Sequence, residues 1–105
     1  MSDQPLILWI QARVKPEFLE QVAAAAARTL VLTLKEPGCV AFHQTAKADD
    51  PCHFCFFEYF ASAAAHAEHM AKPYTLAFFE FLQGKLEAEP VIQPLSALGR
   101  THLDA

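Results

Sequence analysis

The clearest pattern of apolar and polar positions lies between residues 6 and 14. Every even position there is apolar, whereas the odd positions become polar toward Gln11 and Arg13. Because successive side chains of a strand point to opposite faces, this pattern predicts a strand with one face packed under helices. Residues 39–46 and 54–60 predict two further strands, and the sequence KADDP at 47–51 predicts the turn that joins them as a hairpin.

A helical pattern follows the first strand. Pro16 suits the first turn of a helix, and apolar positions then recur at four-residue steps, at Phe18, Val22, Ala26, Leu30 and Leu34. The Pro37-Gly38 pair ends this pattern. We therefore expect one helix from about Pro16 to Lys35.

Shorter elements complete the chain. An alanine-rich helix begins after Ser62 and carries His66 and His69. Another helical segment begins at Pro73, since proline is well tolerated at the first position of a helix. Residues 91–95, which contain one proline and follow another, predict a short edge strand.

The predicted order is strand, helix, strand, strand, helix, strand. This is the plan of the ferredoxin-like fold, an α+β architecture (βαββαβ) in which helices cover one face of an antiparallel sheet. The other face would carry an apolar and aromatic set, which is Trp9, His43, Cys55, Phe57 and Tyr59. Since such a patch is large for a monomer, we expect a homodimer formed sheet to sheet.

Composition limits the classes of function. At 105 residues, 53% hydrophobic and 19% charged, we expect one domain over residues 1–105, with a core at about 6–95 and a less ordered tail at 96–105. A net charge of -4 without a basic stripe argues against nucleic acid as a partner. No basic segment precedes the first apolar run, and no apolar stretch reaches membrane-spanning length. We therefore expect a cytoplasmic protein with no membrane partner.

Glu58 is the strongest candidate for acid or base chemistry. It shares a strand face with Phe54, Phe56 and Phe60. If buried there, its carboxylate would lose hydration worth several kcal/mol unless it were hydrogen-bonded or protonated. The pKa of such a buried carboxyl group differs from its ordinary value, which makes the group a candidate acid or base. The alternative is a glutamate bonded to backbone at a strand end.

Cysteines and histidines suggest metal sites only weakly. Cys52 and Cys55 have metal-ligand spacing, but positions three apart on a strand face opposite ways, so we expect Cys39, Cys52 and Cys55 to be free thiols. On the short helix, His66 and His69 lie on neighbouring faces and could line one cavity. Glu58 could add a third ligand, but the spacing does not enforce convergence, so no metal is predicted.

A wider set of residues resembles the antibiotic biosynthesis monooxygenase domain family. The resemblance extends over about Leu6 to Leu95 and rests on Glu36-Pro37-Gly38-Cys39, Phe42, Asp49-Asp50-Pro51, Phe54, Glu58 with an aromatic at 60, Ala64, His69 and Pro73-Tyr74. It implies a ferredoxin-like subunit that pairs into a dimeric α/β barrel, with a pocket between sheet and helices.

Several positions depart from particular branches of this family. Its relatives include cofactor-free quinol and polyketide oxygenases, heme-degrading enzymes and an isomerase of a phosphorylated sugar derivative. Phe79 and Ile10 stand where the heme-degrading branch carries a histidine and an asparagine, which disfavours heme degradation. Phe60 replaces the usual tryptophan, and Phe56 replaces an asparagine that some oxygenases carry.

The resemblance implies a cofactor-independent monooxygenase that oxidises a small quinol or phenol with dioxygen. In that interpretation His69 takes a phenolic proton, Glu58 orients or assists it, and Tyr74 bonds a carbonyl oxygen. The substrate would be bound by Phe54, Phe56, Phe60, His66 and Phe78, with no cofactor and no metal. Two alternatives remain, an isomerase of a small carbonyl compound and a dimeric ligand-binding protein without catalysis. His43 is a second-rank candidate.

Overall fold

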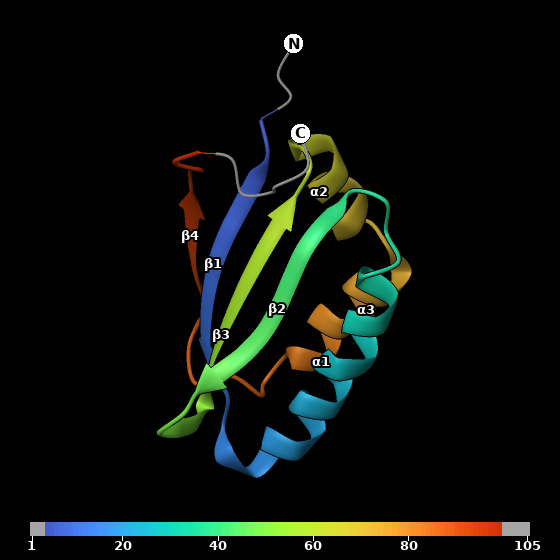
Figure 1. Cartoon of the computed structure of the whole chain (residues 1–105). Coiled ribbons are helices and arrows are strands. Elements are labelled where there is room, and N and C mark those ends of the chain that lie inside the picture. The colour runs from blue at the N-terminus through green and yellow to red at the C-terminus, as the bar shows by residue number, and fades with distance from the viewer. Residues whose placement is uncertain (1–3, 100–105) are drawn as a thin grey trace.

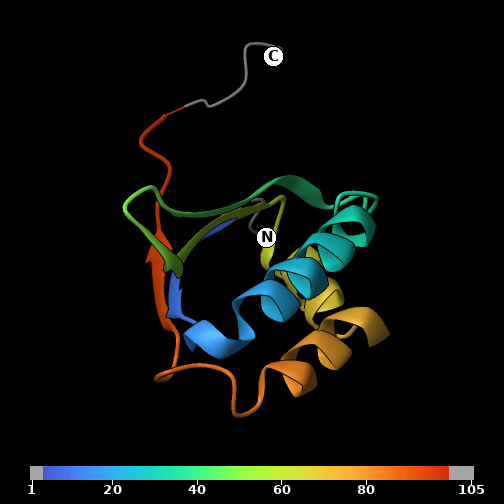
Figure 2. The same ribbon diagram turned by 90° about the horizontal axis from the view of Figure 1, so that it is seen from below.

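The computed structural model describes residues 4–99. In chain order, its elements are β1 (Leu6–Arg13), the 3-10 turn η1 (Pro16–Phe18), α1 (Leu19–Thr33), β2 (Cys39–Lys47), β3 (Asp50–Phe60), α2 (Ala63–Met70), α3 (Pro73–Leu82) and β4 (Val91–Leu95). The strands form one antiparallel sheet in the order β2-β3-β1-β4 (Figure 1). The helices all lie on one face of it (Figure 2). The predicted ferredoxin-like α+β fold is confirmed.

The predicted helix from Pro16 to Lys35 is shorter and interrupted near its start. A 3-10 turn comes first, and the Phe18 backbone, at φ -109° and ψ 5°, separates this turn from α1. At the other end, the N–H groups of Lys35 and Glu36 bond carbonyls three residues back. Because a residue before proline avoids the helical region, Glu36 lies outside the helix, in the turn that leads to β2.

Strand register places Glu58 in the centre of the sheet. β3 is paired on both sides, so Glu58 lies between Leu8 of β1 and Phe42 of β2. Even-numbered positions of β1 and β3 face the helices, on the side where the buried Val22 of α1 also lies. The sequence patterns predicted this choice of face. The helix-facing side of β3 is therefore the wall on which candidate site residues lie.

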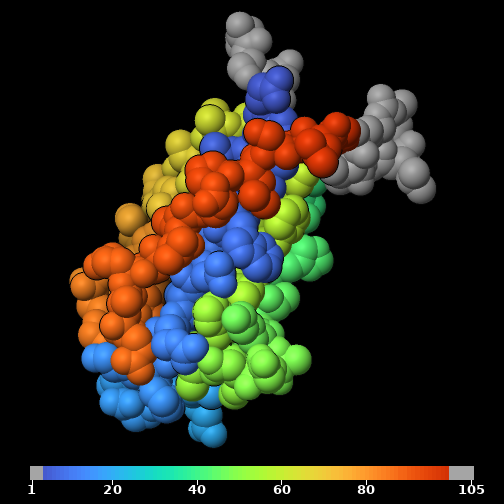
Figure 3. All heavy atoms as spheres, turned by 90° about the vertical axis from the view of Figure 1, so that its left-hand side faces the viewer, coloured from blue at the N-terminus to red at the C-terminus, as the bar shows by residue number. Residues whose placement is uncertain are grey.

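None of the described helices covers the opposite face of the sheet. Figure 3 shows β4, β1, β3 and β2 side by side on this face. A shallow hollow on it is lined by Ile7, Val40, Ala41, Phe57, Tyr59, Leu95, Ser96 and Ala97. All five residues of β4 are exposed. Within residues 4–99, no helix has the length and apolar character needed to cross a bilayer.

Gly38 sets how closely α2 approaches the turn before β2. A Cβ atom at position 38 would lie 2.4 Å from the Cβ of Ala65. The Gly38 carbonyl also accepts a 2.8 Å hydrogen bond from the N–H of Ala61, just before α2. The absence of a side chain therefore lets the turn at 36–38 lie directly against α2.

Gly38→Ala is expected to destabilise the protein by about 1–3 kcal/mol, because the added methyl forces α2 away from the turn. Urea unfolding measures this free energy. Gly99→Ala is the matched control, since no atom lies within 4 Å of a Cβ added there. Equal loss of stability in the two variants would contradict the packing role of Gly38.

Candidate functional site

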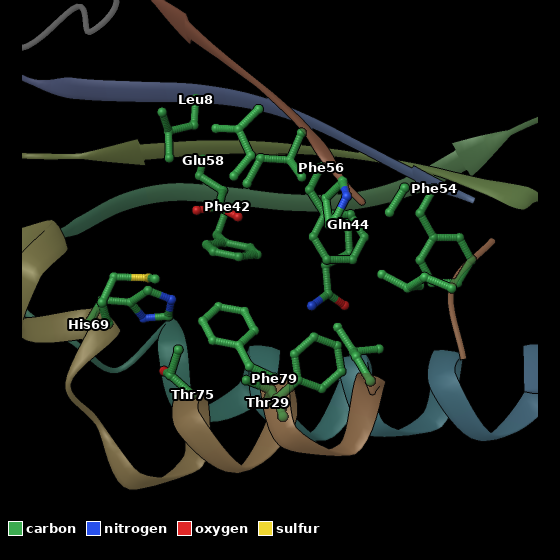
Figure 4. Close-up of a pocket in the computed structure, with 18 of the residues that line it drawn as sticks. Leu8, Thr29, Phe42, Gln44, Phe54, Phe56, Glu58, His69, Thr75 and Phe79 are labelled. Atoms are coloured by element: carbon green, nitrogen blue, oxygen red, sulfur yellow. The ribbon is translucent and has the colours of Figure 1, made fainter. Parts of the chain in front are cut away.

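A cavity of about 390 Å³ lies between the sheet and the helices. Its walls come from all of the described strands and from α1, α2 and α3 (Figure 4). Most lining side chains are aliphatic or aromatic, and the polar ones are Thr29, Gln44, Glu58, His66, His69 and Thr75. A mostly apolar enclosure with a few polar groups is typical of sites for small organic molecules.

Glu58 projects from β3 into this cavity without a hydrogen-bonding partner among residues 4–99. Its residue surface is only 7% exposed. Burial disfavours the charged carboxylate and raises the pKa of Glu58 to about 7. Near neutral pH, the Glu58 side chain is therefore able either to donate a proton or to accept one.

His69 is paired with a carboxylate, which belongs to Glu36. The Nδ1 atom of His69 lies 3.0 Å from Oε2 and 3.2 Å from Oε1 of Glu36. The hydroxyl of Tyr74 donates a hydrogen bond to the same Oε2. Because an ionised carboxylate only accepts, the pairing assigns the ring proton to Nδ1 and leaves Nε2 as the basic nitrogen.

Aromatic packing fixes the ring of His69 at one end of the cavity. The residue is 4% exposed, and its ring centroid lies 5.0 Å from that of Phe60 and 5.9 Å from that of Phe42. Figure 4 shows the imidazole at the cavity edge, on the side where Glu58 and Thr75 also lie. The imidazole is therefore held at Nδ1 by Glu36 and packed against the tilted rings of Phe42 and Phe60.

The structure separates the candidate residues into two groups. Those brought together around the cavity are Phe54, Phe56, Glu58, His66, His69 and Phe78. Phe60 has no exposed surface and packs under His69 instead of lining the cavity. Tyr74 is also absent from the lining, and its hydroxyl is bonded to Glu36. Phe60 therefore acts on the cavity through His69, and Tyr74 acts through Glu36, the partner of His69.

No local sequence pattern assigns a chemical role to Glu36. It appeared only as the first residue of the EPGC motif. The contact with His69 joins positions 33 apart and depends on the close approach of the 36–38 turn to α2, which no local pattern reveals. The only available signal was its place beside the Pro37-Gly38 pair in the family resemblance.

Thr75 was also missed, because a single threonine inside the apolar segment PYTLAFF carries no pattern. It is 2% exposed, and its hydroxyl is buried without a hydrogen-bond partner. It nevertheless lines the cavity. An unpaired buried hydroxyl of this kind costs about 1–3 kcal/mol, so its place on the wall needs an explanation.

Metal ligation by the cavity histidines finds no geometric support. Among residues 4–99, no three His, Cys, Asp or Glu side chains form a group that could hold a metal ion. His66, His69 and Glu58 line one cavity without converging on a point. Cys39, Cys52 and Cys55 are free thiols.

Glu58→Gln is expected to stabilise the protein at high pH but not at low pH. The folded pKa of Glu58 is about 7 against an ordinary 4.5, so only the folded chain holds this proton between those values. The stability that this proton contributes is fully present below about pH 4.5. It is lost as the pH rises to about 7, and the free energy of unfolding falls by about 1.4 kcal/mol for each pH unit in between.

Glutamine at position 58 has no titratable proton, so the variant does not lose this stability as the pH rises. Urea unfolding of both proteins at about pH 4 and pH 8 measures the difference, in which the contributions of other groups cancel. A wild-type and variant difference that is independent of pH would contradict the buried, unpaired state of Glu58.

Comparisons with known proteins place the chain in a family. The family described as antibiotic biosynthesis monooxygenase matches residues 5–80. A curated relative is the uncharacterized protein sll1783 of Synechocystis, 28% identical over 82 residues, which are 78% of this chain and 54% of the relative. The chain thus spans about half the length of that relative.

Solved structures show the same fold at low identity. The structure of Rv0793 from Mycobacterium tuberculosis has a TM-score of 0.86 at 20% identity, covering 93% of this chain and 99% of its own. A crystal structure described as an antibiotic biosynthesis monooxygenase has a TM-score of 0.84 at 23% identity. The match covers 90% of this chain and 99% of that one. With the match over residues 5–80, this chain belongs to the antibiotic biosynthesis monooxygenase family.

Proposed function

We propose that the protein is a cofactor-independent monooxygenase that oxidises a small quinol or other phenol with dioxygen. Family membership supports a monooxygenase-like function in general. The observation that carries the finer proposal is a histidine backed by a buried carboxylate at one end of an aromatic cavity. That arrangement suits the removal of a phenolic proton in a mostly apolar site.

The chemistry needs no group beyond substrate and dioxygen. Triplet dioxygen reacts slowly with closed-shell molecules, but a phenolate can transfer one electron to it directly. The proton of the substrate hydroxyl passes to Nε2 of His69, and the resulting radical and superoxide combine at a ring carbon. Loss of water then leaves a quinone, so one oxygen atom enters the product and the other enters water.

Glu36 supports this step by facing the imidazolium that forms. Its carboxylate lies 3.0 Å from Nδ1 of His69, so the positive charge develops beside a negative one. Glu36 itself is held by the Tyr74 hydroxyl. A base oriented by a hydrogen-bonded carboxylate is a common catalytic arrangement, in which the carboxylate fixes both tautomer and direction.

The aromatic wall suits a flat substrate. Phe54 and Phe56 stack with centroids 5.9 Å apart, and Phe42 meets Phe56 edge to face at 6.2 Å. Together with Phe78 and Phe79 on α3, these rings face the cavity. Such surfaces stack on aromatic rings and keep water from a reactive intermediate.

Oxygen uptake tests the assignment. Protein stripped of metal and flavin is expected to consume dioxygen with a naphthohydroquinone, above the rate of spontaneous oxidation. His69→Ala should lower this rate by about 10²–10⁴-fold, the usual contribution of a general base. Glu36→Gln should give a smaller loss in kcat, because the imidazole remains but loses its orienting charge.

His66→Ala is the matched control. His66 also lines the cavity, with a ring centroid 6.3 Å from that of His69, but no carboxylate of residues 4–99 pairs with it. The control is expected to keep at least about a tenth of the wild-type rate, since the imidazole that it removes is not oriented by a carboxylate of a described residue. Equal rates for His69→Ala and wild type would remove the proposal.

An isomerase remains the second candidate. Glu58 is an acid with a pKa of about 7, and it enters the same cavity as the base His69. An acid and a base on one ligand can move a proton between carbon and oxygen of a carbonyl compound. Turnover of a small carbonyl substrate without oxygen would favour this reaction over oxygenation.

We also propose that the active form is a homodimer joined through the uncovered sheet face. The exposed apolar side chains of Val91 and Leu95 on β4, which pair with Gln11 and Ile7 of β1, and the hollow beside Phe57 and Tyr59 support this. Burying apolar surface of this kind is the usual driving force of subunit association.

Light scattering after size-exclusion chromatography is expected to give twice the mass of one chain. Phe57→Glu should shift the mass toward that of a single chain, because a charge in the interface is costly to bury. A wild-type protein with the mass of one chain at micromolar concentration would contradict the proposed dimer.

A further inference from the structure

Two side chains converge on one oxygen of a buried carboxylate. Nδ1 of His69 on α2 lies 3.0 Å from Oε2 of Glu36, and the hydroxyl of Tyr74 on α3 donates a hydrogen bond to the same atom. The Glu36 side chain is only 8% exposed, so little solvent reaches it. Protein contacts therefore determine the orientation of this carboxylate, and Tyr74 supplies one of them.

The corner between α2 and α3 fixes where the two donors lie relative to each other. Only residues 71–72 separate the helices, and the N–H of Lys72 donates to the carbonyl of His69 at 3.2 Å. Tyr74 follows as the second residue of α3. A hydrogen-bonded backbone therefore presents the Tyr74 hydroxyl and the His69 ring to Glu36 from two different helices.

Glu36 depends on such contacts because no regular element holds it. It lies between α1 and β2, in a turn whose backbone hydrogen bonds join Glu36 to Thr33 at 3.0 Å and to Cys39 at 3.1 Å. Ordering a long side chain costs conformational entropy comparable to what one hydrogen bond contributes, so a single donor holds a glutamate only weakly. A second donor from another element therefore decides whether the carboxylate keeps one orientation.

The orientation of Glu36 in turn selects the tautomer of His69. Phe42 and Phe60 pack against the imidazole, with ring centroids 5.9 and 5.0 Å away, but their side chains have no hydrogen-bonding atom. These contacts hold the ring without distinguishing its two nitrogens. The Glu36 carboxylate does distinguish them, because it pairs with Nδ1, and such a hydrogen bond sets which ring nitrogen carries the proton. A carboxylate that turned away would therefore allow the Nε2–H tautomer to form.

The Tyr74 hydroxyl is suited to a permanent role as donor. Burial, together with the hydrogen bond to Glu36, raises the pKa of Tyr74 to about 12, so the hydroxyl keeps its proton well above neutral pH. Tyr74 does not occur among the described residues that line the cavity. Its hydroxyl therefore serves the carboxylate, outside the cavity lining.

We propose that Tyr74 is a positioning residue that acts through Glu36. Its hydroxyl holds the carboxylate in the orientation that keeps the ring proton of His69 on Nδ1 and leaves Nε2 free to accept a proton. For its kinetic consequence the inference rests on the proposed function, since it names a residue that positions the base of that reaction. The tautomer itself is a property of the protein without substrate, so it is measured independently of turnover.

Nitrogen NMR tests the effect on the tautomer. In protein labelled with ¹⁵N-histidine, at about pH 8 where a free imidazole is neutral, the chemical shifts of the ring nitrogens report the ratio of the Nδ1–H to the Nε2–H form. Signals missing from His69→Ala identify the residue. The wild type is expected to hold mainly the Nδ1–H form. Tyr74→Phe should lower the ratio by about threefold or more, because the carboxylate loses a hydrogen bond.

Tyr59→Phe is the matched control, since Tyr59 is the only other tyrosine of the chain and lies at the hollow on the uncovered sheet face. It should leave the tautomer ratio of His69 unchanged. Glu36→Ala should lower the ratio at least as far as Tyr74→Phe does, and the double variant should lower it no further. A wild type with mainly the Nε2–H form, or an unchanged ratio in Tyr74→Phe, would overturn the inference.

Oxygen uptake with the naphthohydroquinone tests whether Tyr74 acts through Glu36. Tyr74→Phe is expected to lower kcat by about 3–30-fold and to leave KM within about twofold, because a less well oriented base affects the chemical step more than binding. In the Glu36→Ala background the same change should cost less than about twofold, since residues of one network are not additive. Losses that multiply, or a raised KM at unchanged kcat, would indicate a hydroxyl that contacts substrate and would overturn the positioning role.

The two measurements separate this inference from the proposed function. An unchanged tautomer ratio in Tyr74→Phe, with oxygen uptake intact in the wild type, overturns the inference alone. Absence of oxygen uptake in the wild type overturns the proposed function, and the tautomer ratio still decides the role of Tyr74. Phenylalanine keeps the aromatic ring, so the variant tests the hydroxyl and not the packing of the side chain.

Discussion

The close approach of α2 to the turn before β2 is the contact on which the geometry of the site depends. Gly38 and Ala65 meet there with no room for a further carbon atom. This contact brings Glu36 within hydrogen-bonding distance of His69, two residues that belong to different parts of the chain. Packing of the smallest side chains therefore determines a charged interaction, and that interaction determines which imidazole nitrogen is basic.

The two buried carboxyls of the site have different surroundings, which gives them different chemistry. Glu36 is bonded to an imidazole N–H and to a phenolic hydroxyl. Glu58 lies between Leu8 and Phe42 in a mostly apolar cavity and has no hydrogen-bond partner among residues 4–99, so burial favours the neutral acid. Pairs of titratable groups in contrasting environments commonly divide the acid and base roles of an active site.

The fold could be predicted from sequence because its signals are local. The alternation at residues 6–14, the alanine-rich helices and the polar turn at 47–51 each mark one element, and their order defines the topology. The face of Glu58 followed from the same two-residue period. The partners of side chains could not be predicted this way. The Glu36 contact with His69 and the unpaired state of Thr75 depend on how elements approach one another, and Tyr74 was assigned a carbonyl contact because its nearness to Glu36 was unknown.

The connection between α2 and α3 has a consequence for related chains. Only Ala71 and Lys72 separate Met70, where α2 ends, from Pro73, where α3 begins. An α-helix turns about 100° per residue, so an inserted or deleted residue that rotated α3 would replace Thr75 on the cavity wall by a neighbour such as Tyr74 or Leu76. Loop length would then change the ligand preference of a family member without any change in the residues that compose its helix.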